Sequence, residues 1–401
     1  MPAPLRIAEV APEPPPRIVR DLHMLTITPF YPTDEDDACG CFVSEPIEFL
    51  RDERIESSVL ALKPLHRGLR SPNQSSLNTR WARYLCFPGN AGLASSGGFA
   101  YRQLRRQVAR LVKVRHIRLI HAHAPLPCGH IAYLIHRELG LPYVVSIHGL
   151  DVFSTRQVKG SCGERCRRTT SMVLEGAMRV ICVSRHVEMT VKSECRCAST
   201  TVVYNGVKPD LFFAKPHESE DGPVLISVAN LIEIKDHALV LQAIAHLKDR
   251  FPQLQYKIVG NGPERKRLMR LAAELGILDR VHFLGRRTRR DVADLLRSAT
   301  VFVLPSRFEA LGCVYLEAMC TGTPVIACRG QGIEEIVQSG DNGFLVDPGS
   351  SAQLVDCLEL LLSDKSLRVR IGQRGRETVL RELTLSHHAA RLARIYRECV
   401  N

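Results

Sequence analysis

The chain of 401 residues is too long for one ordinary hydrophobic core, so two domains are expected. Its 45% hydrophobic and 24% charged residues are typical of a soluble globular protein, and no apolar run reaches the roughly 18 residues of a membrane-spanning helix. The 54 Lys and Arg exceed the 42 Asp and Glu, and the net charge of +12 favours anionic partners such as nucleotide phosphates or anionic lipid. Because no recognised nucleic-acid-binding motif accompanies this charge, we expect no nucleic-acid partner.

The 14 cysteines are scattered, and no signal-peptide pattern accompanies them. Cys162 with Cys166 and Cys195 with Cys197 form two close pairs, which leaves a structural metal open as an alternative. Neither pair has the Cys-x2-Cys spacing common in zinc sites, so we favour incidental thiols in a reducing cytosol and expect no metal.

Residues 1–21 contain six prolines and are expected to form an extended, disordered leader. Order is predicted to begin with a strand at 23–28, followed by an acidic loop at 31–40 and a helix that carries Phe42, Ile47 and Leu50 on its apolar side. Gly40 directly precedes that helix. It either serves the turn alone or brings backbone N–H groups to a phosphate.

After a second strand at 58–62, residues 64–98 are predicted to be a long connection near the acceptor site. A helix is expected over 101–115, with apolar residues at helical spacing on one side. Its other faces carry basic residues: Arg102, Arg105, Arg106, Arg110 and Lys113. Two interpretations remain open for these, a solvated face and a patch that rests on anionic lipid headgroups.

Two further strands of this domain end in histidines. The strand 117–123 carries His121 and His123 on one face, where structural histidines are favoured over a metal pair because no third ligand is evident. The strand 143–147 runs into His148-Gly149-Leu150-Asp151. Ligands collect at the carboxyl ends of parallel strands, so His148 is a candidate site residue.

The turn Asn205-Gly206 is predicted to close a first domain over 22–207. Strands and helices then alternate again in a second domain over 208–385, where Thr288 and Asp291 predict a capping box. Residues 386–401 are expected to form a last helix that returns to the first domain. This alternation predicts an α/β protein of two doubly wound parallel sheets that face each other across a cleft.

The most informative stretch runs from 301 to 328. It predicts a buried strand, a loop, a helix starting at Gly312 and a second buried strand. Glu309 and Glu317 are separated by seven residues around that helix start. A glycine at a helix N-terminus lets an anion approach free N–H groups, and a carboxylate on either side can accept hydrogen bonds from hydroxyls. A sugar nucleotide has this shape: sugar, diphosphate, ribose.

The segment from Pro305 to Val325 closely resembles the E-x7-E segment of the retaining GT-B glycosyltransferases of family 4, the group 1 type. The resemblance extends over about 23–400 through His148-Gly149-Leu150-Asp151 and Asn205-Gly206-Val207. It implies the GT-B fold, with two Rossmann-like domains of which the first binds the acceptor and the second the nucleotide sugar.

The resemblance also implies roles for individual residues. His148, Glu309 and Lys235 are the expected catalytic residues, and Asp151 is a candidate for acceptor contact or support. The donor is expected to contact Gly40, Asn230, Lys235, Gly260, Gly285, Arg286, Glu309, Leu311, Gly312, Cys313, Val314 and Glu317. At Asn230 this chain departs from the family, which usually has an arginine there, and loses a charge and a bidentate fork.

The implied reaction moves a sugar from a UDP or GDP sugar to a hydroxyl of a saccharide or lipid-linked acceptor, with retention at the anomeric carbon. The nucleotide sugar is a co-substrate, and no cofactor or metal is expected. The expected location is cytoplasmic, and the basic helix leaves peripheral contact with the inner face of an anionic membrane open as an alternative to a solvated face. A GT-B epimerase or phosphorylase and a nucleotide-binding scaffold without catalysis remain as alternatives.

Overall fold

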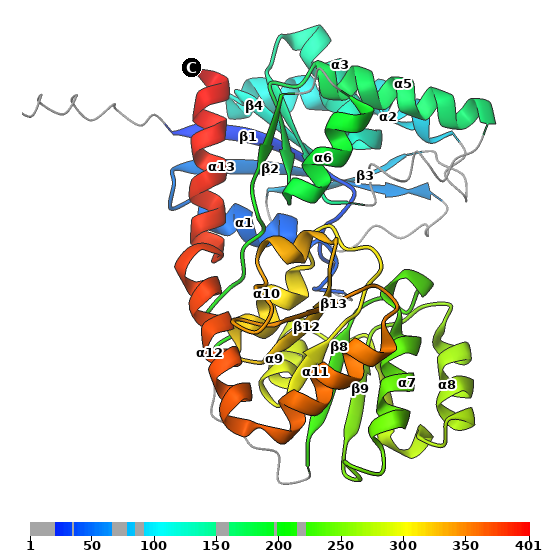
Figure 1. Cartoon of the computed structure of the whole chain (residues 1–401). Coiled ribbons are helices and arrows are strands. Elements are labelled where there is room, and N and C mark those ends of the chain that lie inside the picture. The colour runs from blue at the N-terminus through cyan, green and yellow to red at the C-terminus, as the bar shows by residue number, and fades with distance from the viewer. Residues whose placement is uncertain are drawn as a thin grey trace, which may run out of the picture.

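The computed structural model describes residues 21–33, 36–65, 78–84, 92–149, 160–195, 199–214 and 222–401. The expected leader lies outside these residues except for its last position. Two parallel β-sheets, each with helices packed on its faces, lie one above the other (Figure 1). The expected α/β fold with two doubly wound sheets is therefore confirmed.

The first sheet is built from strands in the first half of the chain: β1 (Leu22–Thr28), β2 (Ile55–Pro64), β3 (Thr79–Tyr84), β4 (Leu119–His123), β5 (Tyr143–Ile147), β6 (Arg179–Cys182) and β7 (Thr200–Val202). Within the described residues their order is β3-β2-β1-β4-β5-β6-β7, and neighbouring strands are parallel. Strand β5 is buried along its whole length, which explains why its sequence is almost continuously apolar.

The helices that accompany this sheet are α1 (Cys41–Leu50), α2 (Leu93–Arg115), α3 (His130–Leu139), α5 (Gly160–Glu175) and α6 (Arg185–Glu194), and the short turn η3 (Pro125–Gly129) precedes α3. The predicted connection 64–98 is wrong in two places, because it contains β3 and the first turns of α2. Those turns are rich in Ser and Gly, which have low helix propensity. They are helical because small residues let α2 approach α3: a Cβ on Gly97 would lie 2.8 Å from Cβ of His130.

The second sheet contains β8 (Val224–Val228), β9 (Gln255–Val259), β10 (Val281–Gly285), β11 (Val301–Val303), β12 (Val325–Cys328) and β13 (Phe344–Val346). Its order is β10-β9-β8-β11-β12-β13, again parallel. The central strands β8 and β11 are almost fully buried. Residues that follow strands of both sheets (Phe30, His148, Ala229 and Gly260) line one cleft, so carboxyl ends of strands in both sheets face the space between them.

The second sheet is covered by α7 (His237–Leu247), α8 (Arg265–Glu274), α9 (Arg289–Arg297), α10 (Cys313–Cys320), α11 (Ser351–Ser363) and α12 (Lys365–Glu382), with the short 3₁₀ turns η4 (Glu233–Lys235), η5 (Leu278–Arg280) and η6 (Gly332–Glu335). The predicted capping box at α9 is confirmed. The Asp291 N–H donates to Oγ1 of Thr288 at 3.1 Å, and the Thr288 N–H donates to Oδ2 of Asp291 at 3.2 Å. This box sets where α9 begins.

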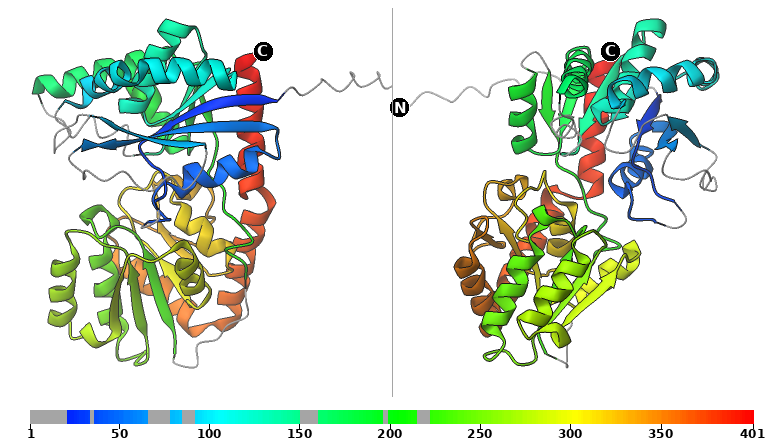
Figure 2. Two further views of the ribbon diagram at one scale, coloured as in Figure 1. Left: turned by 180° about the vertical axis from the view of Figure 1, so that it is seen from behind. Right: turned by 90° about the vertical axis from the view of Figure 1, so that its right-hand side faces the viewer.

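The last helix, α13 (Leu385–Val400), leaves the half that holds β8–β13 and lies alongside the half that holds β1–β7 (Figures 1 and 2). Oη of Tyr396 lies 2.7 Å from Nδ1 of His121 on β4, and Arg397 donates to Glu53 beside α1. The chain therefore crosses between the two halves twice. No helix among the described residues is long and apolar enough to cross a bilayer.

Candidate active site

A cleft of about 560 Å³ lies between the carboxyl ends of the two sheets. Among the residues expected from the sequence, it brings together Gly40, His148, Asn230, Lys235, Gly260, Arg286 and Glu309. Six other expected residues do not line this cleft. They are Gly285, at the end of β10, and Leu311, Gly312, Cys313, Val314 and Glu317, which lie in the loop after β11 and in α10. Asp151 lies outside the described residues.

Gly40 is the residue before α1 and has φ of 76°, a left-handed conformation that favours glycine. A Cβ at this position would lie 2.4 Å from the carbonyl carbon of Phe30, so a larger residue would push the two loops apart. The turn alone therefore requires glycine. It also places the N-terminus of α1 at the cleft.

His148 follows β5 and lies against a second histidine. Its Nε2 is 2.9 Å from Nδ1 of His123, and the two rings stack with centroids 5.1 Å apart. Burial, with a smaller contribution from His388, lowers the pKa of His148 to about 3. The imidazole is therefore neutral near pH 7 and can exchange hydrogen bonds with a hydroxyl without carrying charge.

The two other expected catalytic residues form an ion pair. Nζ of Lys235, in η4, lies 2.5 Å from Oε2 of Glu309, and the side chains are only 16% and 14% exposed. The backbone N–H of Glu309 donates to Oε1 of Gln331 at 2.9 Å, which fixes the loop that carries the carboxylate. Asn230 lies on the same side of the cleft and is exposed.

The glycines at the ends of β9 and β10 have a structural reason of their own. Gly260 has φ of 134°, and a Cβ there would lie 1.9 Å from the carbonyl oxygen of Ala229. Its N–H donates to the carbonyl of Gly285, which has φ of 69°. The backbone therefore requires glycine at these positions whether or not the donor contacts them.

Gly312 precedes α10 with φ of 80°, and a Cβ there would lie 2.5 Å from the ring of Tyr315. The next side chain, Cys313, accepts a hydrogen bond from Nδ2 of Asn205 at 3.0 Å. Burial, and then the charge of Glu317, raises the pKa of Cys313 to about 12, so its thiol is neutral. Leu311 is buried, so only its backbone could face a ligand.

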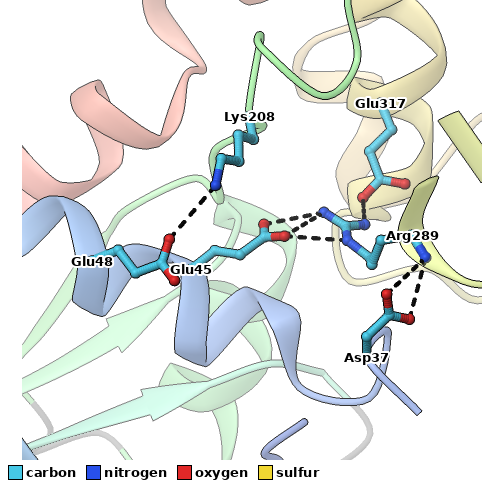
Figure 3. A network of polar contacts seen from close by, with 6 residues as sticks. All are labelled: Asp37, Glu45, Glu48, Lys208, Arg289 and Glu317. Atoms are coloured by element: carbon cyan, nitrogen blue, oxygen red, sulfur yellow. Dashed lines mark hydrogen bonds and ion pairs between the residues drawn. The ribbon is translucent and has the colours of Figure 1, made fainter. Parts of the chain in front are cut away.

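Glu317 on α10 is held by a residue that the sequence analysis missed. Nη1 of Arg289 donates to Oε1 of Glu317, while Nε and Nη2 of the same guanidinium donate to Glu45 on α1 at 3.0–3.2 Å (Figure 3). Burial raises the pKa of Glu45, and Arg289 opposes that rise. One arginine of the second half thus joins a carboxylate from each half.

The acidic loop before α1 contacts the arginine-rich segment before α9. Asp36 pairs with Arg286, and the backbone N–H of Arg289 donates to both oxygens of Asp37 at 3.2 Å. Arg286, which was expected to contact the donor, pairs with Asp36 across the cleft and also lines it. The opposite charges of the two segments were the available signal for this contact.

A second contact between the halves lies at η6. Glu335, the last residue of η6, accepts hydrogen bonds from the backbone N–H groups of Arg185 and His186 at the start of α6. It also accepts from Oη of Tyr204 at 2.8 Å. Its carboxylate satisfies the N–H groups of a helix in the other half.

The other histidines and cysteines of interest have the following positions. His121 is buried between Ser146 and Tyr396, each 2.7 Å from one ring nitrogen, as expected for a structural histidine. Cys166 and Cys195 are buried and Cys162 is exposed, whereas Cys197 lies outside the described residues. Among the described residues, no group of three or more His, Cys, Asp or Glu could hold a metal ion.

Two sequence models of known families match the chain. The model described as Glycosyltransferase Family 4 matches residues 47–211, and the model described as Glycosyl transferases group 1 matches residues 210–378. They meet where the chain passes from the first sheet to the second.

One curated relative and two solved structures extend this comparison. The lipopolysaccharide core biosynthesis glycosyltransferase LpsE of Rhizobium meliloti is 35% identical over 167 residues, which cover 42% of this chain and about half (47%) of that relative. Sucrose-phosphate synthase from Thermosynechococcus elongatus superposes with a TM-score of 0.78 at 22% identity, covering 94% of this chain and 98% of the other. HepE of Anabaena in complex with UDP-glucose superposes with a TM-score of 0.72 at 21% identity, covering 94% and 100%. These likenesses in structure establish a shared fold.

Proposed function

Because the chain belongs to the glycosyl transferases of group 1, we propose that it moves a sugar from a nucleoside diphosphate sugar to a hydroxyl acceptor, with retention at the anomeric carbon. The observation that carries this proposal is the convergence of His148, Lys235 and Glu309 on one cleft between two doubly wound sheets. The similarity to a lipopolysaccharide glycosyltransferase supports a role in polysaccharide or glycolipid biosynthesis.

In this proposal the donor diphosphate binds Lys235 and the backbone N–H groups at the start of α10. The phosphate replaces Glu309 as the partner of the Lys235 ammonium group, and the released carboxylate accepts hydrogen bonds from the sugar hydroxyls. The close Lys235–Glu309 pair supports this exchange, since both side chains already face one position in the cleft. Glu317 binds the ribose hydroxyls.

Bond cleavage at the anomeric carbon builds negative charge on the leaving diphosphate. In this proposal the Lys235 ammonium group and the N–H groups at the start of α10 stabilise this charge in the transition state. We therefore propose that the reaction requires no divalent cation and no cofactor. His148, with its neutral imidazole, exchanges a hydrogen bond with the sugar close to the reacting carbon.

For the acceptor we propose a saccharide, either free or linked to lipid at the cytoplasmic face of an anionic membrane. Support for the membrane contact comes from the exposed basic residues of α2: Arg102, Arg106, Arg110 and Lys113. Arg105 contributes less, because its guanidinium already pairs with Glu138 at 2.7 Å. Flotation with anionic vesicles, but not with neutral ones, is the expected result.

The experiment that tests the function begins with calorimetric titration of UDP and GDP. UDP is the first choice because HepE binds UDP-glucose. A nucleotide at 100 times its Kd should also raise the free energy of unfolding by about 2.7 kcal/mol. Sugars of the nucleotide that binds are then incubated with the protein without added metal, and NMR follows the anomeric configuration of the product.

The possible results separate the alternatives. Binding with transfer and an α-product from an α-donor supports the proposal. Binding without turnover favours a scaffold, and an isomerised or phosphorolysed donor favours an epimerase or phosphorylase. If neither nucleotide binds, the donor site is wrongly assigned.

A further inference from the structure

Arg289 is a largely buried cation shared by two largely buried carboxylates. The side chains of Arg289, Glu45 and Glu317 are 12%, 17% and 7% exposed. Removal of a buried carboxylate from water is unfavourable unless a cation and hydrogen bonds replace the lost hydration. Because Glu45 and Glu317 both depend on one guanidinium, the position of either affects the other.

The guanidinium contacts Glu317 in a way that orients it. Arg289 donates to Oε1 of Glu317, and among the described residues no hydrogen bond is donated to Oε2. The carboxylate is thus anchored through one oxygen, and the other keeps its capacity to accept a hydrogen bond from a ribose hydroxyl. A side chain fixed by such a neighbour binds its ligand with less loss of conformational entropy.

The same guanidinium also binds α1, which belongs to the first half of the molecule. Nε and Nη2 form a bidentate contact with the carboxylate of Glu45 (Figure 3). Glu45 lies on α1 about one turn after Gly40. The guanidinium carbon also lies 4.9 Å from the ring centre of the buried Phe212. Arg289 therefore holds α1, whose N-terminus opens at the cleft, at a set distance from Glu317.

We propose that Arg289 is a positioning residue for Glu317, and that Glu45 makes this positioning depend on the docking of α1 against the second half. The inference rests on the proposed function, in which Glu317 receives the ribose. When the Glu45 contact is lost, Arg289 is drawn fully to Glu317, and two parallel N–H groups of the guanidinium then occupy both carboxylate oxygens. The ribose then competes with an arginine, and nucleotide affinity falls.

A double-mutant cycle with UDP and GDP as probes tests whether Glu45 acts on nucleotide binding through Arg289 and Glu317. Glu45→Ala is expected to weaken binding of the nucleotide about tenfold, which lies in the range measured for residues in contact. In the Glu317→Gln background the same Glu45→Ala change should alter the Kd by less than about twofold, because the step through which Glu45 acts is already removed. A merely structural contribution of Glu45 would persist in both backgrounds.

Two further variants serve as comparison. Glu48→Ala removes the exposed pair with Lys208 at 3.6 Å, one turn along the same helix, and should leave the Kd unchanged. Arg289→Lys keeps the charge but loses the planar fork needed for two carboxylates, so it should weaken binding as Glu45→Ala does. If Glu45→Ala impairs folding, Glu45→Gln keeps the size of the side chain and takes its place in the cycle.

The outcomes distinguish this inference from the function on which it rests. Failure of the wild type to bind either nucleotide overturns the donor-site assignment and the inference together. Normal binding by the wild type with an unchanged Kd in Glu45→Ala overturns the inference alone. An equal loss in Glu48→Ala, or an undiminished loss in the Glu317→Gln background, also overturns it.

Discussion

Nζ of Lys235 lies 2.5 Å from Oε2 of Glu309, so two side chains that the proposal assigns to different parts of the donor form an ion pair with each other. Both are largely buried beside the cleft. A diphosphate carries more negative charge than a carboxylate, so it can compete for the ammonium group and release Glu309. The pair keeps both charges neutralised until that exchange.

Lys235→Ala should therefore act mainly on the chemical step. Loss of one preorganised group that stabilises the leaving diphosphate is expected to lower kcat about 10²–10³-fold, equivalent to about 2.7–4 kcal/mol. Steady-state kinetics with the sugar nucleotide that the wild type uses would measure this. Lys266→Ala, an exposed lysine on α8, is the matched control and should keep wild-type kcat. An unchanged kcat in Lys235→Ala would remove Lys235 from the catalytic group.

Buried histidines make the stability of the protein depend on pH. Burial lowers the pKa of His121 and His148 to about 3 and that of His237 and His388 to about 4, against 6.5 for an exposed histidine. Between these values the unfolded chain binds more protons than the folded one, so the free energy of unfolding falls as pH decreases below 6.5. Above pH 6.5 these histidines are neutral in both the folded and the unfolded chain, so no stability is lost through their protonation.

The pH dependence can be assigned to one histidine by substitution. His121→Asn should reduce the slope of unfolding free energy between pH 5 and 6 by about 1 kcal/mol per pH unit, measured by urea titration. His116→Asn, at an exposed position whose φ of 49° suits asparagine, is the control for the effect of the substitution itself. Equal slopes in the wild type and His121→Asn would show that His121 is not buried in the neutral form.

Glu335→Ala should loosen the contact between η6 and α6. The carboxylate satisfies two N–H groups at a helix N-terminus, a role whose removal lowers stability by about 0.5–2 kcal/mol. Thermal or urea unfolding would measure the loss. Glu382→Ala removes an exposed glutamate whose ion pair is with its neighbour Arg381, and it should change stability little. Similar losses in the two variants would contradict a capping role for Glu335.

Gly40→Ala should lower the free energy of unfolding by more than the strain of a positive φ alone. The strain of a Cβ at positive φ is about 1–2 kcal/mol. At Gly40 a clash with the Phe30 carbonyl adds to it, whereas at Gly330, with φ of 71°, nothing lies within 4 Å of an added Cβ. Unfolding experiments on Gly40→Ala and Gly330→Ala would isolate the clash, and equal losses would show that the loop before α1 relaxes without penalty.

Much of the fold follows from local patterns in the sequence. Apolar runs such as 143–147 and 301–304 have the length and composition of strands buried on both faces, and the capping box at Thr288 marks a helix start. The strand end at 147 predicted a site residue at His148, the family resemblance added Lys235 and Glu309, and all three line the cleft. Local propensity failed for the first turns of α2, where close packing on α3 outweighs the low helix propensity of Ser and Gly.

The sequence by itself determined the alternation of elements, the two sheets and the residues at their carboxyl ends, because periodicity and turn chemistry act between near neighbours. Only the tertiary structure decided which charges meet. Arg289 is one of four arginines in Arg286–Arg290, and nothing in that run distinguishes the one that is buried. Its partners Glu45 and Glu317 are 244 and 28 residues away in the chain. They come within hydrogen-bonding distance because the two halves pack together, and this long-range placement has no signature in local sequence.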